Sequence, residues 1–427
     1  MDIRLPYGRG VLEGALPDSR VKAVLKSGID AYRPAAGPRE LVEESLRSPI
    51  GSSPLHELSR GKRRVVLLAS DHTRPVPSKI IVPQMLEEIR RGNPEAEITI
   101  LIATGCHRGP TRAELEEKFG PQIVAEERIV IHDSADEASM VDLGTLPGGG
   151  RLRLNRLATQ ADLLVSEGFI EPHFFAGFSG GRKSVLPGVA GRQTVYANHC
   201  AQFIDDPKAR CGILDGNPIH RDMLFAARKA GLGFIVNVVI NSDRQIVASF
   251  AGDCDLAHRK GAEFLAGLCR VPAKPAEIVI TTNNGYPLDQ NIYQTVKGLC
   301  TAEATGIPGS VIIMAAACED GAGGEAFFQT FAQEQDAGHI LERIRAVPSD
   351  ETQADQWQSQ ILARILENFR VILISEAPDE LVRSLHMLPA HSLEEAVSLA
   401  DRLLGFPGKI TVIPEGVSTI ISAGRRR

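Results

Sequence analysis

The chain has 427 residues, of which 43% are hydrophobic, and its formal net charge is −6. This length exceeds what one ordinary hydrophobic core fills, so it predicts two domains. An acidic chain argues against nucleic-acid binding, which needs a basic domain or stripe, and Arg425–Arg427 is too short to supply one.

Seven cysteines are scattered along the chain without a C-x-x-C pair. This usage is typical of a reducing compartment and not of a disulfide framework or a zinc site. The first residues, MDIRLPYGRG, lack the apolar stretch of a signal peptide, and no run approaches the about 20 apolar residues that cross a membrane. We therefore expect a cytoplasmic protein with neither a nucleic-acid nor a membrane partner.

Short runs rich in valine and isoleucine alternate with amphipathic segments along the chain. This alternation predicts an α/β fold with largely parallel sheets flanked by helices. The predicted strands are Arg64–Leu68, Glu97–Ile102, Arg128–His132, Ala161–Ser166, Phe234–Ile240, Glu277–Thr281, Ser310–Met314, Arg370–Ile374 and Lys409–Ile413.

Two of the predicted helices begin with a capping-box pattern. Thr111-x-x-Glu114 opens TRAELEEKFG, and Ser392-x-x-Glu395 opens SLEEAVSLADRLLG, which ends at Gly405. Further helices are expected after Gly191 and near Asp289.

A domain boundary is expected at VPAKPAE, Val271–Glu277, because it carries two prolines between an amphipathic helix and a new strand. This predicts an N-terminal α/β domain at residues 1–272 and a C-terminal α/β domain at residues 273–427, with the active-site cleft between them. The final residues can pack back on the first domain.

Polar and ionisable side chains follow four of the predicted strands, at the point where each strand ends. The residues concerned are Asp71, Arg74, His107, His173, Tyr293, Gln294 and Lys297. Because ligands of open α/β sheets bind at the carboxyl ends of strands, this placement predicts a shared site.

Two of these positions have chemistry that suits an acidic ligand. Arg74 offers a planar fork that fits a carboxylate. Lys297 follows Gln294 by three residues and Tyr293 by four, so the three share one face of the helix expected near Asp289. A plain solvated helix face gives the same pattern.

The stretch GFSGGRKSVLPGVAG, which starts at Gly177, looks like a phosphate-binding loop. It misses the P-loop template because Arg182 stands where that template needs glycine, and no G-x-G-x-x-G follows a predicted strand. Its glycines still allow close backbone approach and an anion-binding nest of N–H groups. Taken alone, such a loop is more often a plain turn.

Three of the eleven histidines, His107, His173 and His199, lie in or near these segments. Each alone is an ordinary residue, and no H-x-H or H-x-x-x-H pair supplies a complete zinc site. One histidine can still bind a metal whose other ligands come from a cofactor.

Taken together, these segments resemble the nickel-pincer lactate racemase family. The resemblance rests on five segments in the family's order: SDHTRP at Ser70–Pro75, ATGCHRG at Ala103–Gly109, EPHFFAGFSGGRKSVLPGVAG at Glu171–Gly191, ANHC at Ala197–Cys200 and NGYPLDQNIYQTVKG at Asn284–Gly298. These segments span most of the chain.

The resemblance implies a cofactor, a pyridinium-3,5-bisthiocarboxylic acid mononucleotide that grips nickel as a pincer. By the family pattern Lys183 carries it as a thioamide, and His199 supplies the remaining nickel ligand. Ser179, Gly180 and Gly181 would form the loop that holds it, so the N-terminal domain would be the cofactor-binding one. Enzymes of cofactor biosynthesis are implied partners.

The resemblance also implies racemisation or epimerisation of a small 2-hydroxy acid by hydride transfer from and to C2. His107 and His173 match the two acid–base positions, and histidine's pKa suits both directions. The matching substrate positions are Arg74 and Lys297, which would clamp the carboxylate, the supporting Asp71, Tyr293 and Gln294, and Trp357, which would cover the pocket.

Two alternatives come from other classes of protein. A nicotinamide-dependent 2-hydroxy acid dehydrogenase would use histidine and arginine in the same way, but it should carry a dinucleotide fingerprint. A non-catalytic nickel- or nucleotide-binding protein would need neither paired histidines nor a carboxylate clamp. The matched residues recognise only a carboxylate and a hydroxyl, which leaves the particular acid open. Arg182 can be a further anion contact or only a loop cation.

Overall fold

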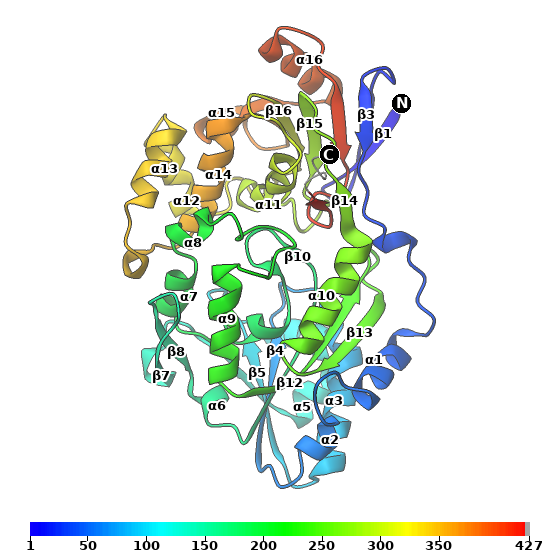
Figure 1. The fold of residues 1–427 in the computed structure, drawn as a ribbon, viewed down its shortest axis with the longest axis vertical. Coiled ribbons are helices and arrows are strands. Elements are labelled where there is room, and N and C mark those ends of the chain that lie inside the picture. Colours follow the sequence, from blue (N-terminus) through cyan, green and yellow to red (C-terminus); the bar gives the residue numbers. More distant parts are fainter. Residues whose placement is uncertain (423–427) are drawn as a thin grey trace.

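The computed structural model describes residues 1–422 and shows two lobes stacked along the long axis (Figure 1). β4, β5 and β12 lie in the lower lobe of this view, and β15 and β16 lie in the upper one. The predicted arginine run Arg425–Arg427 lies outside the described residues.

The lower lobe is built on a six-stranded sheet of order β13-β12-β9-β4-β5-β6. Its strands pair in parallel except β12 with β13, which are antiparallel. They are β4 (Arg64–Ser70), β5 (Glu97–Ala103), β6 (Arg128–Ile131), β9 (Leu163–Phe169), β12 (Leu232–Ile240) and β13 (Ile246–Gly252).

The upper lobe is built on a second six-stranded sheet of order β18-β17-β16-β15-β19-β3, parallel throughout. Its strands are β3 (Val21–Val24), β15 (Ile278–Thr282), β16 (Val311–Ala315), β17 (Arg370–Ile374), β18 (Leu388–Ala390) and β19 (Ile410–Ile413).

Four two-stranded sheets complete the strands. They are the hairpins β1 (Asp2–Tyr7) with β2 (Gly10–Ala15), β7 (Met140–Thr145) with β8 (Arg151–Asn155) and β10 (Pro172–His173) with β11 (Gly177–Phe178), and the parallel pair β14 (Arg270–Pro272) with β20 (Ile420–Ser422).

Sixteen α-helices surround the sheets within residues 1–422. Those before β15 are α1 (Pro38–Arg47), α2 (Leu55–Leu58), α3 (Ser78–Gly92), α4 (Arg112–Phe119), α5 (Pro121–Glu126), α6 (Arg156–Thr159), α7 (Arg192–Asn198), α8 (Ala201–Asp205), α9 (Pro218–Lys229) and α10 (Leu256–Cys269). Those after it are α11 (Ile292–Glu303), α12 (Glu325–Ala332), α13 (Ala337–Arg345), α14 (Gln356–Asn368), α15 (Asp379–Ser384) and α16 (Leu393–Leu404).

Alternation along the strands distributes the core between the two faces of the first sheet. Val65 and Leu67 pack with α1 to α3, in a cluster that includes Met85. Val66 and Leu68 belong to a larger cluster that continues through α9 and into Val296 and Leu299 of α11 in the upper lobe. One hydrophobic core therefore joins the two lobes.

The predicted α/β class is confirmed, and so are all nine predicted strands, whose ends differ from the predicted ones by at most three residues. The capping box at Thr111 and Glu114 is present. At α16 Ser392 caps the helix and Gly405 ends it in the left-handed region, but the Glu395 carboxylate accepts from the His391 N–H at 2.7 Å. This second site is therefore not the reciprocal box that its pattern predicts.

The two helices expected near functional residues are shorter than predicted. The first, α7, ends at Asn198, and His199 is its C-cap. The second, α11, begins at Ile292 because Asn291 caps it, whereas the Asp289 carboxylate accepts from the Gly8 and Ala317 N–H groups at 2.6 and 3.1 Å.

The domain division between residues 272 and 273 stays a prediction, but the first strands do not pack as its N-terminal range implies. Strand β3 pairs with β19, and Ile3, Leu5 and Leu16 share a core with the second sheet. The blue β1 and β3 accordingly lie in the upper lobe (Figure 1). At the other end, β20 pairs with β14, and Ile420 packs with Ile170 of the lower lobe.

Candidate active site

The candidate site is built on the carboxyl ends of three neighbouring parallel strands, β4, β5 and β9. The segments that follow them carry Asp71 and Arg74, His107, and His173 respectively. Parallel pairing alone brings these ends to one edge of the sheet, which is where the sequence places its reactive residues.

The buried carboxylate of Asp71 is hydrogen-bonded to the partly exposed imidazole of His107. The Oδ2 atom of Asp71 lies 2.8 Å from Nδ1 of His107, and its Oδ1 accepts from the N–H and hydroxyl of Thr73 at 2.9 and 2.6 Å. Burial tends to raise the pKa of Asp71, but these hydrogen bonds outweigh it and lower the pKa to about 2. The ionised carboxylate holds the proton of His107 on Nδ1 and leaves Nε2 free to accept another.

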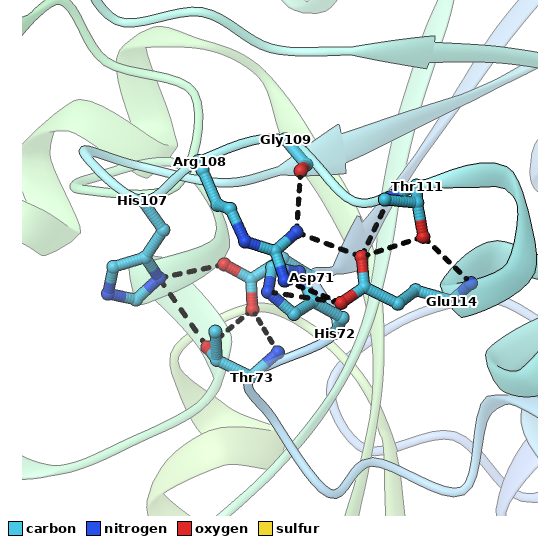
Figure 2. A network of polar contacts seen from close by, with 8 residues as sticks. All are labelled: Asp71, His72, Thr73, His107, Arg108, Gly109, Thr111 and Glu114. Carbon is cyan, nitrogen blue, oxygen red and sulfur yellow. Dashed lines mark hydrogen bonds and ion pairs between the residues drawn. The ribbon is translucent and has the colours of Figure 1, made fainter. Parts of the chain in front are cut away.

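Glu114 ties the same two loops together on the far side of this pair (Figure 2). Its carboxylate accepts hydrogen bonds from both terminal nitrogens of Arg108, at 2.9 and 2.5 Å, and from the Thr111 N–H, at 2.7 Å. His72 approaches it to 3.8 Å. The hydrogen bond with Arg108, foremost, holds the pKa of Glu114 well below its usual range, so it is a carboxylate at neutral pH.

His173 lies in the short hairpin of β10 and β11, packed on two phenylalanines. Its ring stacks on Phe174 at 5.0 Å and meets Phe175 edge-on at 4.6 Å. The Ala176 N–H donates to Nδ1 at 3.2 Å, so the neutral ring carries its proton on Nε2, opposite to His107. Burial, and then the charges of Lys183 and Lys297, hold the pKa of His173 well below its usual value.

His199 is buried at the end of α7 and has one free ring nitrogen. Its Nδ1–H donates to the Val195 carbonyl at 2.9 Å, and its ring packs against Phe175 and Trp357 at 5.1 Å each. Burial, and then the charge of Lys183, lower the pKa of His199 to about 3. The imidazole is therefore neutral with Nε2 unprotonated, the form that binds a metal.

Lys183 lies in the 3₁₀ turn η3 (Gly181–Ser184), 5.9 Å from the ring centre of Phe175. Burial, and then the charge of Arg182, hold the pKa of Lys183 well below its usual value, which increases the fraction of its amine that is neutral and therefore nucleophilic. The turn depends on two glycines. Gly180 and Gly181 have φ of +84° and +53°, and a Cβ at Gly181 would lie 2.9 Å from His258.

The amides of this loop mostly donate within the protein. The N–H groups of Ser179, Gly181 and Lys183 donate to Glu171 O, Asn237 Oδ1 and Gly180 O at 2.9, 2.7 and 3.2 Å. These three amides therefore shape the loop and are not free for an anion.

Arg182 is fully buried, and its hydrogen bonds go to groups of the protein. It donates to the carbonyls of Gly180 and Ala176 at 3.1 and 2.8 Å and contacts Nε2 of His258 at 2.9 Å. Of the two readings of this residue, the structure supports a loop cation, because its hydrogen-bond partners are main-chain carbonyls and one imidazole.

Arg74 and Lys297 approach the site from different lobes. Arg74 follows β4 in the lower lobe, and Lys297 lies on α11 in the upper one. Burial, and then the charge of Arg74, lower the pKa of Lys297 to about 8, so the two cations act on each other. Their charges also act on His173. The three side chains therefore converge on one region.

The remaining positions predicted to bind substrate, Tyr293, Gln294 and Trp357, lie on α11 and α14. The Tyr293 hydroxyl donates to Asp355 at 2.9 Å, and burial, followed by Asp355, raises the pKa of Tyr293. The Oε1 atom of Gln294 is buried without a partner among residues 1–422. Trp357 packs on His199 and on Tyr196, at 5.1 and 6.0 Å. The assignment of these residues to a substrate site stays a prediction.

Sequence reasoning did not single out Glu114 as part of the site, nor Asp355 and Phe175. Glu114 was identified only as a helix cap, and its contact with Arg108 depends on the path of the loop between them. Asp355 carries a φ of +61°, which no sequence pattern announces for an aspartate. Phe175 contacts both His173 and His199. Its place two residues after the predicted His173 is a signal in the sequence that could have identified it.

Within residues 1–422, no group of three or more His, Cys, Asp and Glu side chains is arranged to hold a metal ion. No helix in the same range is long and apolar enough to cross a membrane.

Parallel α/β sheets whose strand ends bring ionisable side chains together are the arrangement of enzymes that act on small molecules. Family models described as the lactate racemase N-terminal domain and the lactate racemase C-terminal domain match residues 7–212 and 271–421. The chain belongs to the lactate racemase family. Racemases are isomerases, so the protein is an enzyme of that class.

Individual relatives agree with the family models. The chain is 51% identical over 421 residues to a lactate racemase of Thermoanaerobacterium thermosaccharolyticum, which covers 98% of this chain and 99% of the relative. It is 49% identical over 420 residues to one of Lactiplantibacillus plantarum, with coverage of 98% and 99%.

The fold agrees with solved structures as well. The lactate racemase apoprotein from T. thermosaccharolyticum superposes with a TM-score of 0.96 at 50% identity, covering 99% of this chain and all of that one. A Thermotoga maritima protein at 19% identity, covering 91% of this chain and 99% of that one, has a TM-score of 0.66 and shares the fold.

Proposed function

We propose that this protein racemises lactate by inversion at C2, and that Lys183 and His199 would hold a nickel-pincer nucleotide, which would supply the hydride chemistry of that inversion. The observation that carries the proposal is the convergence of two histidines, held in opposite tautomers, with two cations from different lobes. The names of the relatives support lactate among the 2-hydroxy acids.

The residues present fit the proposed cofactor. His199 has a neutral ring with Nε2 free, which suits a single protein ligand to nickel. Lys183 has a nucleophilic amine, which suits covalent attachment, and Ser179, Gly180 and Gly181 form the turn that presents it. When bound, the group supplies an electrophilic store for hydride, which no side chain provides.

The two histidines divide the proton transfer. The Nε2 atom of His107 accepts the hydroxyl proton of one enantiomer, and the charge it then carries is stabilised by Asp71. His173 serves the hydroxyl on the opposite side. To accept a proton at Nε2 it must release the hydrogen bond from Ala176.

The two cations orient the substrate. Arg74 and Lys297 bind its carboxylate, so that C2 is held in one place while its hydroxyl meets either histidine. Gln294 offers an unpartnered carbonyl, and Tyr293 and Trp357 close the site from the upper lobe.

Loading the site raises the pKa of His173 towards its ordinary range. Burial, the largest cause of the lowered pKa, would remain. An amide at Lys183 would have no charge, however, and a bound carboxylate would offset Arg74 and Lys297, so the further lowering by these charges would be removed. The histidine is thus a weak base in the empty protein and a usable one in the loaded complex.

The decisive test is racemisation of D- and L-lactate by protein produced together with the cofactor-biosynthesis enzymes, without added nicotinamide. A panel of larger 2-hydroxy acids defines the substrate range. Racemisation without nicotinamide argues against a dehydrogenase, and any turnover argues against a binding protein. Loaded protein that inverts none of these acids would overturn the proposal.

A second measurement tests attachment. Intact-mass spectrometry should show an adduct that maps to Lys183, and Lys183→Ala should lack it. A fully active Lys183→Ala protein with full nickel content would contradict the assignment. The localisation of both protein and biosynthesis enzymes is expected to be the cytoplasm.

A third measurement separates the histidines. In single turnover, His107→Ala should form ketone from only one enantiomer and His173→Ala from only the other, each with the lost half-reaction slowed about 10²–10⁴-fold. Equal oxidation of both enantiomers by both variants would show that the two-base assignment is wrong.

A further inference from the structure

The loop that carries His107 is anchored unequally on its two sides. Before His107, Gly105 N–H donates to Gly188 O at 2.9 Å and the Thr104 hydroxyl donates to His132 O at 2.7 Å. After it, Arg108 and Gly109 are exposed. On that side, the loop is held by the ion pair of Arg108 with Glu114 and by the burial of Pro110.

Asp71 by itself does not determine where the imidazole stands. Its hydrogen bond fixes which nitrogen of His107 carries the proton, but the ring is 45% exposed and rides on the loop. A base must meet the substrate hydroxyl within a few tenths of an ångström, so the position of the loop matters as much as the tautomer.

Glu114 contacts more than a helix cap requires. A capping glutamate needs only the N-cap N–H, which here is that of Thr111, at 2.7 Å. Glu114 also accepts two hydrogen bonds from Arg108, next to His107, and lies 3.8 Å from His72, next to Asp71. The carboxylate thus stands between the neighbours of both members of the pair, as Figure 2 shows.

The chain contains a natural comparison. Glu395 occupies the same position in α16, three residues after Ser392, and its side chain accepts only from the His391 N–H, at 2.7 Å. It ties down no loop of the site. The two glutamates share a place in a helix and differ in what surrounds them.

We propose that Glu114 is a positioning residue, which fixes the place of His107 by clamping Arg108 and His72 to the first turn of α4. This inference rests on the proposed function only for its kinetic consequence, since the effect on the imidazole exists in the protein without cofactor. In this role Glu114 acts through the two loops that it contacts.

The kinetic test uses loaded Glu114→Gln protein in single turnover with each enantiomer. The half-reaction that His107→Ala abolishes should slow by about 10- to 100-fold, the scale of a displaced catalytic group. The half-reaction that His173→Ala abolishes should change less than about twofold. A merely weakened fold would slow both half-reactions together.

Two further variants sharpen the result. Glu395→Gln makes the same chemical change at a matched cap and should alter neither half-reaction. Arg108→Gln should resemble Glu114→Gln, and the double variant should be no slower than either single one, because both remove one clamp. Additive losses in the double variant would contradict action through Arg108.

The imidazole itself can be observed without turnover. In apoprotein labelled at the histidine nitrogens, NMR should show His107 mainly as the Nδ1–H tautomer. Glu114→Gln should shift it towards a mixture, because a loosened loop carries the ring away from the Asp71 carboxylate that fixes the tautomer, whereas Glu395→Gln should not. An unchanged His107 signal in Glu114→Gln overturns the inference. If loaded wild-type protein inverts no acid, the proposed function fails, and this NMR comparison still decides the role of Glu114.

Discussion

At the residue scale, the two candidate bases differ in what holds their Nδ1 atoms. His107 donates from Nδ1 to an ionised carboxylate, and His173 accepts at Nδ1 from a main-chain N–H. The carboxylate leaves Nε2 of the neutral His107 ring unprotonated, whereas burial, followed by the surrounding cations, lowers the pKa of His173. The two histidines therefore differ in tautomer and in surroundings in the protein without cofactor, although the proposed racemisation requires each to accept a proton.

The charge of Lys183 is expected to control His173. Replacing Lys183 by Met removes a neighbouring cation, so the pKa of His173 should rise, whereas Lys183→Arg should keep it low. NMR titration of the histidine rings in apoprotein measures this, with His173→Gln to assign the signal. The same pKa in both variants would show that burial alone depresses it.

The lowered pKa of Lys297 predicts that substrate binding weakens at alkaline pH. Its pKa is lowered to about 8, so its charge is present below about pH 8 and is lost above it. The KM for lactate should therefore rise up to about tenfold per pH unit above that value, while kcat changes less because a bound carboxylate restores the proton. Lys297→Arg should keep KM flat over this range, and a rise of equal size in that variant would point to another group.

At the element scale, the turn that presents Lys183 is held by a buried arginine. Arg182 joins the carbonyls of Ala176 and Gly180, one on each side of the β11 strand, and so spans the hairpin and the turn. Burial lowers its pKa to about 9, which measures the cost of placing a charge there. The conformation of the turn therefore depends on Arg182, although burying its charge is energetically unfavourable.

Arg182→Lys should expose that dependence. The variant keeps a buried charge but loses the planar fork, so about 2 kcal/mol of unfolding free energy should be lost with the hydrogen bonds to the carbonyls. Urea unfolding of the apoprotein measures it. Arg192→Lys, an exposed substitution on α7, is the control and should stay within about 0.5 kcal/mol of wild type.

At the scale of the whole molecule, the order of the chain and the order of the lobes differ. The chain starts in the upper lobe with β1 to β3 and crosses to the lower one. It then returns, so that the N–H of Gly28 donates to Leu268 O at 2.8 Å. The two segments that connect the lobes therefore lie side by side at Gly28 and Leu268. The C-terminal lobe is complete only with the first residues of the protein.

This arrangement predicts how fragments behave. Residues 269–427 alone should fail to fold cooperatively, because they lack β3 and expose the core that Ile3, Leu5 and Leu16 cover. Residues 1–27 joined to 269–427 by a short glycine–serine linker should fold, and Leu5→Asp in that fusion should prevent it. Circular dichroism and size-exclusion chromatography distinguish the outcomes, and a cooperatively folded 269–427 fragment would contradict the expectation.

The strands and the residues that follow them were predictable from local pattern. Val65 to Leu68 form an apolar run too short for a helix and end at Asp71, and parallel sheets place such ends together by geometry alone. The family segments around His107, His173 and Lys183 were equally readable, since each is a short continuous stretch. These features depend on neighbours in the chain, which is the range over which propensity acts.

Contacts between distant segments were decided only by the tertiary structure. The pairing of β3 with β19 joins residues almost four hundred positions apart, and nothing in VKAV states its partner. The sequence identifies Glu114 only as a helix cap, and the structure adds its ion pair with Arg108. Likewise, the sequence places a helix start near Asp289, whereas in the structure the Asp289 carboxylate accepts a hydrogen bond from the Gly8 N–H. The tautomer of His107 follows from such a contact, because its ring proton lies on the nitrogen that faces the Asp71 carboxylate.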